Sequence, residues 1–120
     1  MKTRAFRMNL HPGMADEYRT RHDQLWPELA DALLQAGIVD YRIFLDPDSH
    51  ALFAVMQHED QHLLDQLPEL PVMQRWWQHM KDIMSSHPDG SPVSLELVPM
   101  FELRTDPVQE LPHAAPRPTQ

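Results

Sequence analysis

The chain has 120 residues, enough for a single domain with a sizeable hydrophobic core, and 42% hydrophobic with 23% charged residues is an ordinary globular balance. The formal net charge is −8 and no run of Lys and Arg occurs, which disfavours a nucleic-acid or anionic-membrane partner. The chain has no cysteine, which excludes disulfides, thiolate zinc sites and cysteine nucleophiles.

The first residues, MKTRAFRMNLHP, lack the continuous apolar segment of a signal peptide. No stretch approaches the roughly 18 consecutive apolar residues that a membrane-spanning helix requires. We therefore expect a cytosolic protein without a membrane partner.

In MKTRAFRMNL, the apolar residues Phe6, Met8 and Leu10 alternate with polar ones, which predicts a strand. Between residues 14 and 36 the apolar spacing changes to three and four residues, which predicts a helix. Pro27 lies within this helix and lacks a backbone N–H, so we expect a kink or break there.

Gly37 is typical of a helix end. The next two runs, YRIFL and ALFAVMQ, are rich in β-formers and enclose a turn-like DPDSH, which predicts a hairpin. We expect a short helix over 59–66, a break at LPELP and a second long helix over about 71–84. HPDGSP then predicts a loop, and SLELVPMFEL predicts a last strand whose Pro99 implies an edge position or a bulge.

The order β-α-β-β-α-β is typical of a ferredoxin-like α+β domain, with both helices on one face of a four-stranded antiparallel sheet. The strands carry apolar residues on both sides; Phe44, for example, points opposite to Ile43. Pairing of two sheets in a homodimer of the dimeric α/β-barrel type would cover the open face. We expect this domain to span residues 1–103, and the proline-rich residues 104–120 to form a disordered tail.

The segment HEDQH, residues 58–62, matches the H-E-x-x-H pattern of zinc peptidases. Its context is poor, because His58 directly follows an apolar strand and no third ligand stands at a recognisable spacing. We interpret the segment as a solvated helix start with acidic residues that suit the helix dipole, and expect no metal site.

Tyr18 and His22 are four residues apart, so their side chains can converge on one face of the first helix. An unperturbed histidine pKa near ~6.5 suits proton transfer at neutral pH. A core histidine with a structural hydrogen bond is the more common case, because buried His and Tyr usually find structural partners, and the residues alone leave both interpretations open.

Trp76 and Trp77 are adjacent, and neighbouring helical residues point about 100° apart, so the two indoles cannot share one apolar stripe. The pair could belong to the core and a dimer contact, or form a stacking platform for a sugar ring. Tyr41 lies on one defined face of the second strand, and the pattern does not distinguish whether helices or a cavity cover that face.

Five stretches in chain order resemble the L-rhamnose mutarotase family: EYRTRHDQLWPEL, DYRIFLD, ALFAV, MQRWWQHM and HPDGSPVSLEL. The similarity runs from about Lys2 to Leu103 and does not include the proline-rich end. The motifs are specific: a Tyr-x-x-x-His, then Trp-Pro-Glu-Leu, then Gln-Arg-Trp-Trp.

The resemblance implies a cofactor-free, homodimeric cytosolic enzyme that interconverts the α and β anomers of L-rhamnose. The family's catalytic histidine falls on His22, and its sugar-contacting residues fall on Tyr18, Tyr41, Trp76 and Trp77. All five positions carry the residue type that the resemblance requires.

Mutarotation opens the pyranose ring to an aldehyde and closes it on the other carbonyl face, which requires proton transfers but no metal, electron or nucleotide. A positioned imidazole typically contributes about 10²–10⁴-fold to such transfers. The second proton-transfer group could be Tyr18, Tyr41 or a bound water. Two other functions suit the same fold, a non-catalytic small-ligand-binding module and a cofactor-free oxygenase.

Overall fold

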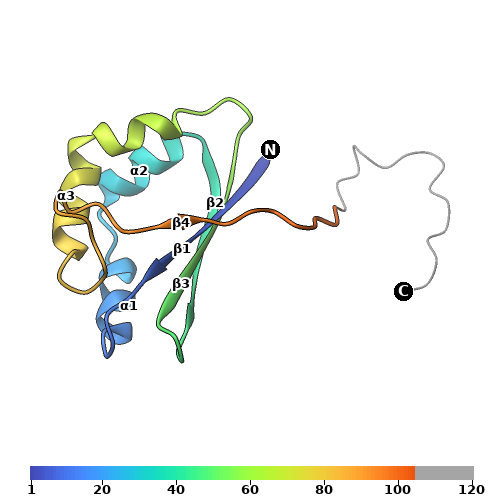
Figure 1. The fold of residues 1–120 in the computed structure, drawn as a ribbon. Coiled ribbons are helices and arrows are strands. Elements are labelled where there is room, and N and C mark those ends of the chain that lie inside the picture. Colours follow the sequence, from blue (N-terminus) through green and yellow to red (C-terminus); the bar gives the residue numbers. More distant parts are fainter. Residues whose placement is uncertain (105–120) are drawn as a thin grey trace, which may run out of the picture.

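The computed structural model describes residues 1–104, and its elements follow the predicted order (Figure 1). Two helices replace the predicted first helix. The elements are β1 (Lys2–Asn9), α1 (Ala15–Asp23), α2 (Pro27–Gln35), β2 (Ile38–Asp46), β3 (Ala51–His58), η1 (Leu64–Glu69), α3 (Pro71–Met80) and β4 (Leu95–Glu96).

The strands form one antiparallel sheet in the order β2-β3-β1-β4, and the helices cover one of its faces (Figure 1). This topology confirms the predicted ferredoxin-like α+β fold. The register places Phe6, Ala54 and Ile43 in one row on the helical face. Leu52 from the sheet and Leu29 from α2 are almost fully buried in this core.

The other face of the sheet has no helical layer among residues 1–104. A row of side chains crosses all four strands there, because Phe44 pairs with Phe53, Phe53 with Arg7, and Arg7 with Leu95. Phe44 is 57% exposed and Leu95 is 61% exposed. The predicted apolar character of this face is therefore present in the structure.

The break in the long helical segment lies where Pro27 predicts it. α1 ends at Asp23, Trp26 is extended, and Pro27 is the first residue of α2. At this position a backbone N–H would have no partner within the helix, so its absence in proline costs no hydrogen bond. At the other end of α2, the Gly37 N–H donates to the Leu34 carbonyl at 3.0 Å. Gly37 has φ +111°, which confirms it as the helix end.

The short helix predicted over 59–66 is misplaced, since the structure has a 3₁₀ helix over 64–69 that contains Pro68. The backbone before it is held by the α2–β2 turn: Glu59 N–H donates to the Gly37 carbonyl at 2.9 Å, and Leu63 N–H to the Ala36 carbonyl at 2.8 Å. These long-range bonds replace the local bonds that a helix over 59–63 would need.

The second long helix ends at Met80 rather than near residue 84, and Met84 instead forms a bridge with Leu10. The last strand is much shorter than predicted, since only Leu95 and Glu96 pair with β1, followed by one bond from Leu97 N–H to the Ala5 carbonyl. Pro99 has no N–H to continue this pairing, and the chain leaves the sheet (Figure 1).

Arg104 is the only residue of the predicted tail, 104–120, that falls inside the described part of the chain. Within residues 1–104, no helix is both long and apolar enough to cross a membrane.

Candidate active site

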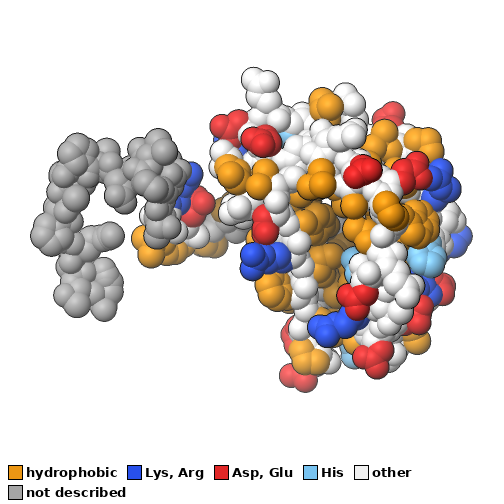
Figure 2. Space-filling view, turned by 180° about the vertical axis from the view of Figure 1, so that it is seen from behind, with side chains coloured by type: hydrophobic (Ala, Val, Ile, Leu, Met, Phe, Trp, Pro, Cys, Tyr) orange, Lys and Arg blue, Asp and Glu red, His pale blue; other side chains and the backbone are white. Residues whose placement is uncertain are grey.

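A cavity of about 1620 Å³ lies between the helical face of the sheet and the helices above it, and Figure 2 shows hydrophobic side chains in a hollow between these layers. Typical small-molecule pockets measure about 300–1,000 Å³, so this one is large and partly open. Tyr18, His22, Tyr41, Trp76 and Trp77 all line it. The fold therefore brings together the five residues that the resemblance singles out.

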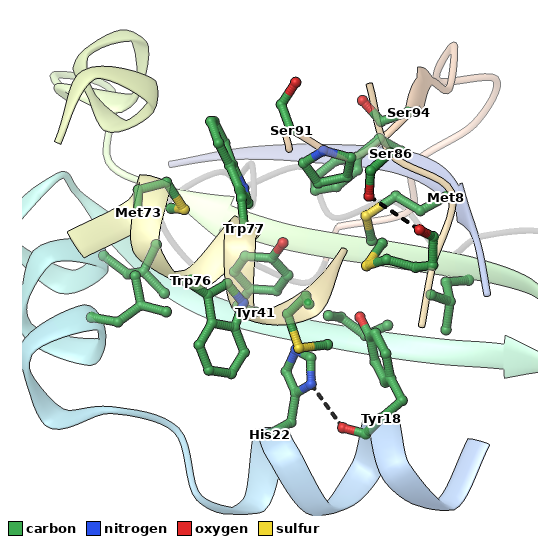
Figure 3. A pocket seen from close by; sticks show the side chains of 18 of the residues that line it. Met8, Tyr18, His22, Tyr41, Met73, Trp76, Trp77, Ser86, Ser91 and Ser94 are labelled. Carbon is green, nitrogen blue, oxygen red and sulfur yellow. Dashed lines mark hydrogen bonds between the residues drawn. The ribbon is translucent and has the colours of Figure 1, made fainter. Parts of the chain in front are cut away.

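His22 and Tyr18 rise from successive turns of α1 toward the pocket (Figure 3). Their rings stack with centroids 4.2 Å apart and planes 28° from parallel. The spacing of four residues on one helix thus produces the convergence that the sequence predicts. Tyr18 is 9% exposed and belongs to the core, while His22 is half-buried at the pocket surface.

A single hydrogen bond defines which nitrogen of His22 carries the proton. The Nδ1 atom lies 3.0 Å from the Tyr18 backbone carbonyl, and because a carbonyl only accepts, Nδ1–H is the donor. In the neutral ring, Nε2 then holds the free lone pair. Figure 3 shows the edge of the ring opposite this bond directed away from α1.

Burial lowers the pKa of His22 below its ordinary value of 6.5. The hydrogen bond to the Tyr18 carbonyl and the charge of Asp23 act in the opposite direction and offset part of this effect. A neutral imidazole with an accessible lone pair is the form that can act as a general base near neutral pH.

The two tyrosines present protonated phenols to the same cavity. Burial raises the pKa of Tyr41 to about 12, and burial together with the proximity of Tyr41 raises the pKa of Tyr18. Within residues 1–104, every fully buried side-chain oxygen or nitrogen has a hydrogen-bond partner. The hydroxyls of Tyr18 and Tyr41 form no hydrogen bond to these residues, so they are not fully buried. Both hydroxyls are therefore accessible from the cavity, and the raised pKa keeps each of them protonated near neutral pH.

Trp76 and Trp77 take different positions, as adjacent residues on α3 must. Trp76 is 8% exposed and packs edge-on against His22 at 5.4 Å and against Trp26 at 5.1 Å. Trp77 is half-buried and points from α3 toward Ser91, away from Trp76 (Figure 3). Trp76 thus supports the histidine, whereas Trp77 offers a free ring surface in the pocket.

Sequence reasoning missed several residues that line the cavity. Ser86, Ser91 and Ser94 place polar side chains along one wall (Figure 3). Ser91 and Ser94 belong to segments interpreted only as a loop and a strand start, and Ser86 precedes that loop. Methionines form much of the apolar wall, including Met8 and Met73. No sequence signal distinguishes such residues, because loop serines and core methionines are common in any domain.

The H-E-x-x-H segment has no part in this cavity. His58 is the last residue of β3, as its position after an apolar run predicts, and its ring contacts that of His62 with centroids 4.6 Å apart. Each ring already bonds to backbone, His58 Nδ1–H to the Glu59 carbonyl and Leu64 N–H to His62 Nδ1. Among residues 1–104, no group of three or more His, Cys, Asp or Glu is placed to hold a metal ion.

Comparison with known proteins gives consistent matches over the described domain. The family model for L-rhamnose mutarotase matches residues 3–103. An L-rhamnose mutarotase of Burkholderia cenocepacia is 60% identical over 103 residues, which are 86% of this chain and 99% of that protein. The L-rhamnose mutarotase of Jannaschia sp. is 52% identical over 103 residues, with the same two shares of 86% and 99%.

Among solved structures, the crystal structure of an L-rhamnose mutarotase from Formosa agariphila superposes with a TM-score of 0.81 at 38% identity. The match covers 87% of this chain and 100% of that one. An antibiotic biosynthesis monooxygenase matches with a TM-score of 0.55 at 11% identity, over 84% of this chain and 100% of that one. At this low identity the second likeness shows the shared fold alone.

Proposed function

Because the chain belongs to the L-rhamnose mutarotase family, we propose that it interconverts the α and β anomers of L-rhamnose by opening and closing the pyranose ring. The observation that supports this most directly is the state of His22. Its Nδ1–H is held by the Tyr18 carbonyl, which leaves Nε2 free as a base beside two protonated phenols. We further propose, as the resemblance implies, that the enzyme works in the cytosol without a cofactor.

Ring opening transfers two protons while one bond breaks. His22 Nε2 takes the proton of the anomeric hydroxyl, and the electron pair of that O–H bond forms the carbonyl as the C1–ring-oxygen bond breaks. A phenol of Tyr18 or Tyr41 gives its proton to the ring oxygen, because an alkoxide is a stronger base than a phenolate. After rotation about C1–C2, closure on the other face of the aldehyde returns both protons.

The remaining residues would hold the sugar and exclude water. Trp77 suits stacking against the C–H face of the pyranose, and Trp76 restrains the His22 ring from behind. The methyl group of a 6-deoxy sugar suits the apolar wall near Met8. An added hydroxyl in such a wall changes binding by only about 1–3 kcal/mol, so selection against related sugars is expected to be incomplete.

We also propose that the protein is a homodimer, with the open face of the sheet as the contact. Phe44 and Leu95 are exposed on that face. The segment after β4 adds further exposed apolar side chains, and Figure 2 shows hydrophobic residues where this segment leaves the body. These residues are Val98 (78% exposed), Met100 (89%), Phe101 (84%) and Leu103 (74%). Exposed large apolar side chains in such number are typical of an interface between proteins.

Replacing the histidine tests the proposed activity. We expect His22→Ala to lose at least about 100-fold of the enzyme-dependent rate of anomer exchange, since general acid–base catalysis contributes about 10²–10⁴-fold. Saturation-transfer NMR on L-rhamnose, corrected for the spontaneous rate, measures this exchange. His50→Asn is the matched control, because it removes an imidazole from the β2–β3 turn, outside the cavity, and asparagine tolerates the φ of 64° there. Undiminished exchange with His22→Ala would contradict the role of His22.

A further inference from the structure

α1 carries both His22 and Tyr18, yet the fold gives this helix little support. Only Tyr18 is buried along its length, and its first turn has no side-chain cap. The break at Pro27 separates it from α2, so α2 does not define its tilt. Another contact must therefore hold α1 where its two site residues meet α3.

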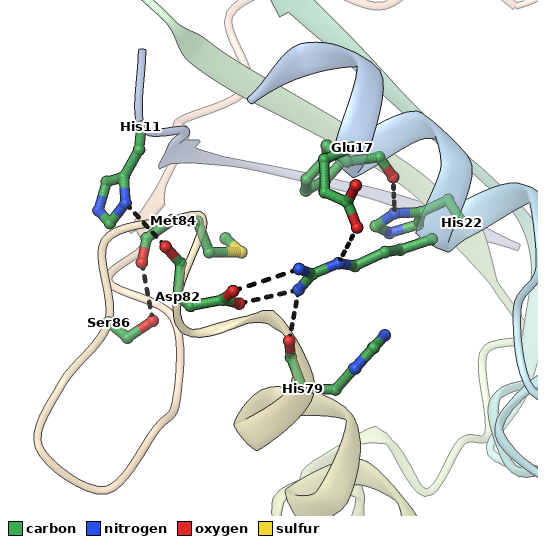
Figure 4. A network of polar contacts seen from close by, with 9 residues as sticks. His11, Glu17, His22, His79, Asp82, Met84 and Ser86 are labelled. Atoms are coloured by element: carbon green, nitrogen blue, oxygen red, sulfur yellow. Dashed lines mark hydrogen bonds and ion pairs between the residues drawn. The ribbon is translucent and has the colours of Figure 1, made fainter. Parts of the chain in front are cut away.

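Arg21 makes that contact, and Figure 4 shows its hydrogen bonds. Its Nε donates to Glu17 Oε2 at 2.8 Å, one turn back on α1. Nη1 and Nη2 donate to the two carboxylate oxygens of Asp82 at 2.9 and 3.2 Å, and Nη1 also donates to the His79 carbonyl. The side chain of Arg21 is only 14% exposed, which is low for an arginine.

The partners of Arg21 belong to the end of the helix that carries the tryptophans. His79 lies in the last turn of α3, where carbonyls have no partner within the helix, so Arg21 also caps α3. Asp82 follows two residues after the end of α3. Within residues 1–104, the bonds of Arg21 are the only hydrogen bonds between α1 and this end of α3.

We propose that Arg21 and Asp82 form a clamp that positions α1 against the end of α3 and so holds the His22 ring at its working distance from Trp76. Arg21 directly precedes His22 in the chain, and Trp76 lies one turn before His79 on α3. The centroids of His22 and Trp76 are 5.4 Å apart with their planes at 90°, an arrangement that a small tilt of α1 would change. Arg21 and Asp82 are positioning residues, because neither is argued to touch the sugar.

The geometry of the clamp differs from that of an ordinary surface ion pair. A planar guanidinium bound to both oxygens of one carboxylate restricts direction as well as distance. Arg75 and Glu28 offer the contrast, since they join α2 to α3 through one bond of 2.9 Å and the side chain of Arg75 is 54% exposed. The two carboxylates do not differ in this respect, because Asp82 is 67% exposed and Glu28 68%. Arg75→Met is therefore a matched control for Arg21→Met, because it removes an arginine ion pair from α3 without affecting α1.

The test compares the single variants Arg21→Met, Asp82→Asn, Arg75→Met and Arg42→Met. We expect Arg21→Met to lower kcat for anomer exchange by about 10- to 100-fold with a smaller change in KM, as a small misplacement of a catalytic group does. Asp82→Asn should act in the same direction, and the double variant should be no worse than Arg21→Met alone, because both residues belong to one unit. Because Arg75 also lines the cavity, the control for kcat is Arg42→Met, which removes the Arg42–Asp40 ion pair outside the cavity and should leave kcat unchanged.

The clamp proposal rests on the proposed function, and a second measurement, the pKa of His22, tests the clamp without requiring turnover. NMR titration of the ligand-free protein should show the pKa of His22 rising toward its ordinary value in Arg21→Met and Asp82→Asn but not in Arg75→Met, because a loosened α1 admits water to the ring. The clamp is overturned if both variants keep the parent kcat and His22 pKa, if Arg75→Met matches their effect on the His22 pKa, or if Arg42→Met matches their effect on kcat. If the parent protein shows no exchange of L-rhamnose anomers, the proposed function fails while the titration still decides on the clamp.

Discussion

The chemistry of His22 depends on two properties of its ring, the tautomer and the pKa. The backbone of its own helix fixes the tautomer, since Nδ1–H bonds to the Tyr18 carbonyl four residues earlier. The surrounding rings of Tyr18 and Trp76 remove water and lower the pKa of the imidazole. Among residues 1–104 no carboxylate bonds to this ring, so the backbone carbonyl alone defines which nitrogen is free.

The lowered pKa of His22 predicts how stability and activity change with pH. Because the unfolded chain has the ordinary pKa of about 6.5, it binds more protons than the folded protein between that pH and the lower folded pKa. The free energy of unfolding should therefore fall as pH falls through this window, and the neutral base should persist throughout the neutral range. kcat/KM should stay level near neutrality and decline only below the lowered pKa.

Two measurements check this prediction. NMR titration of labelled histidine, with His22→Ala to assign the resonance, gives the pKa directly. Urea denaturation at pH 7 and pH 5 gives the stability change, which should be smaller in His22→Ala than in the parent protein. A His22 pKa above 6.5 would contradict the assignment of burial as the dominant influence.

At the scale of elements, the connection from α2 to β2 is a tightly constrained turn. An added Cβ at Gly37 would lie 3.0 Å from the Cβ of His62 and 3.4 Å from its Cα, and φ is +111°. Gly13 also has a positive φ, +81°, but a Cβ there would meet nothing within 4 Å. The two glycines therefore separate backbone strain from crowding.

We expect Gly13→Ala to reduce the free energy of unfolding by about 1–3 kcal/mol through backbone strain alone. Gly37→Ala should cost about 1–3 kcal/mol more, because the methyl group also displaces the segment at His62. Urea denaturation of both variants measures the difference. If both variants lose the same free energy of unfolding, the segment 59–63 moves to accommodate the added methyl group without a measurable cost, which contradicts the prediction.

The same segment shows where prediction from sequence stops. Periodicity and proline chemistry were sufficient for the first strand, the hairpin and the break at Pro27, because the causes are local. The helix predicted over 59–66 was wrong because Glu59 bonds to Gly37, a partner distant in sequence. The last strand was overextended because its length depends on the edge of β1, which no pattern in SLELVPMFEL records.

The site divides in the same way. Spacing alone brought Tyr18 and His22 to one helix face but favoured a structural role for them, and the family resemblance supplied their proposed roles in catalysis. The sequence does not show that the free lone pair is on Nε2 of His22, because this follows from the bond between Nδ1 and a backbone carbonyl. Arg21 gave no signal at all, because the carboxylate of Asp82 lies 61 residues away.

For the whole molecule, the proposed homodimer depends on the open face of the sheet. Phe44→Glu places a charge in the row formed with Phe53, Arg7 and Leu95. Burying a Phe side chain contributes about 1.5–3 kcal/mol, so the dimer Kd should rise at least about tenfold. Sedimentation velocity over a concentration series measures this change.

Leu34→Glu is the control for this substitution. Leu34 is 61% exposed, close to the 57% of Phe44, but it belongs to α2 in the helical layer. Its substitution should leave the association state unchanged. A monomeric parent protein, or an equal effect of the two substitutions, would contradict the proposed interface.

The shortness of β4 also affects how the protein resists aggregation. Beyond the pairs at Phe6 and Arg7 and the bond to Ala5, the described chain leaves the outer edge of β1 uncovered over residues 2–4. An uncovered strand edge is a template on which further chains can stack without limit. Lys2 and Arg4 occupy this stretch, and charged edge residues oppose such stacking by mutual repulsion. Neutralising Lys2, which lies outside the cavity, would be expected to shorten the shelf life of concentrated protein.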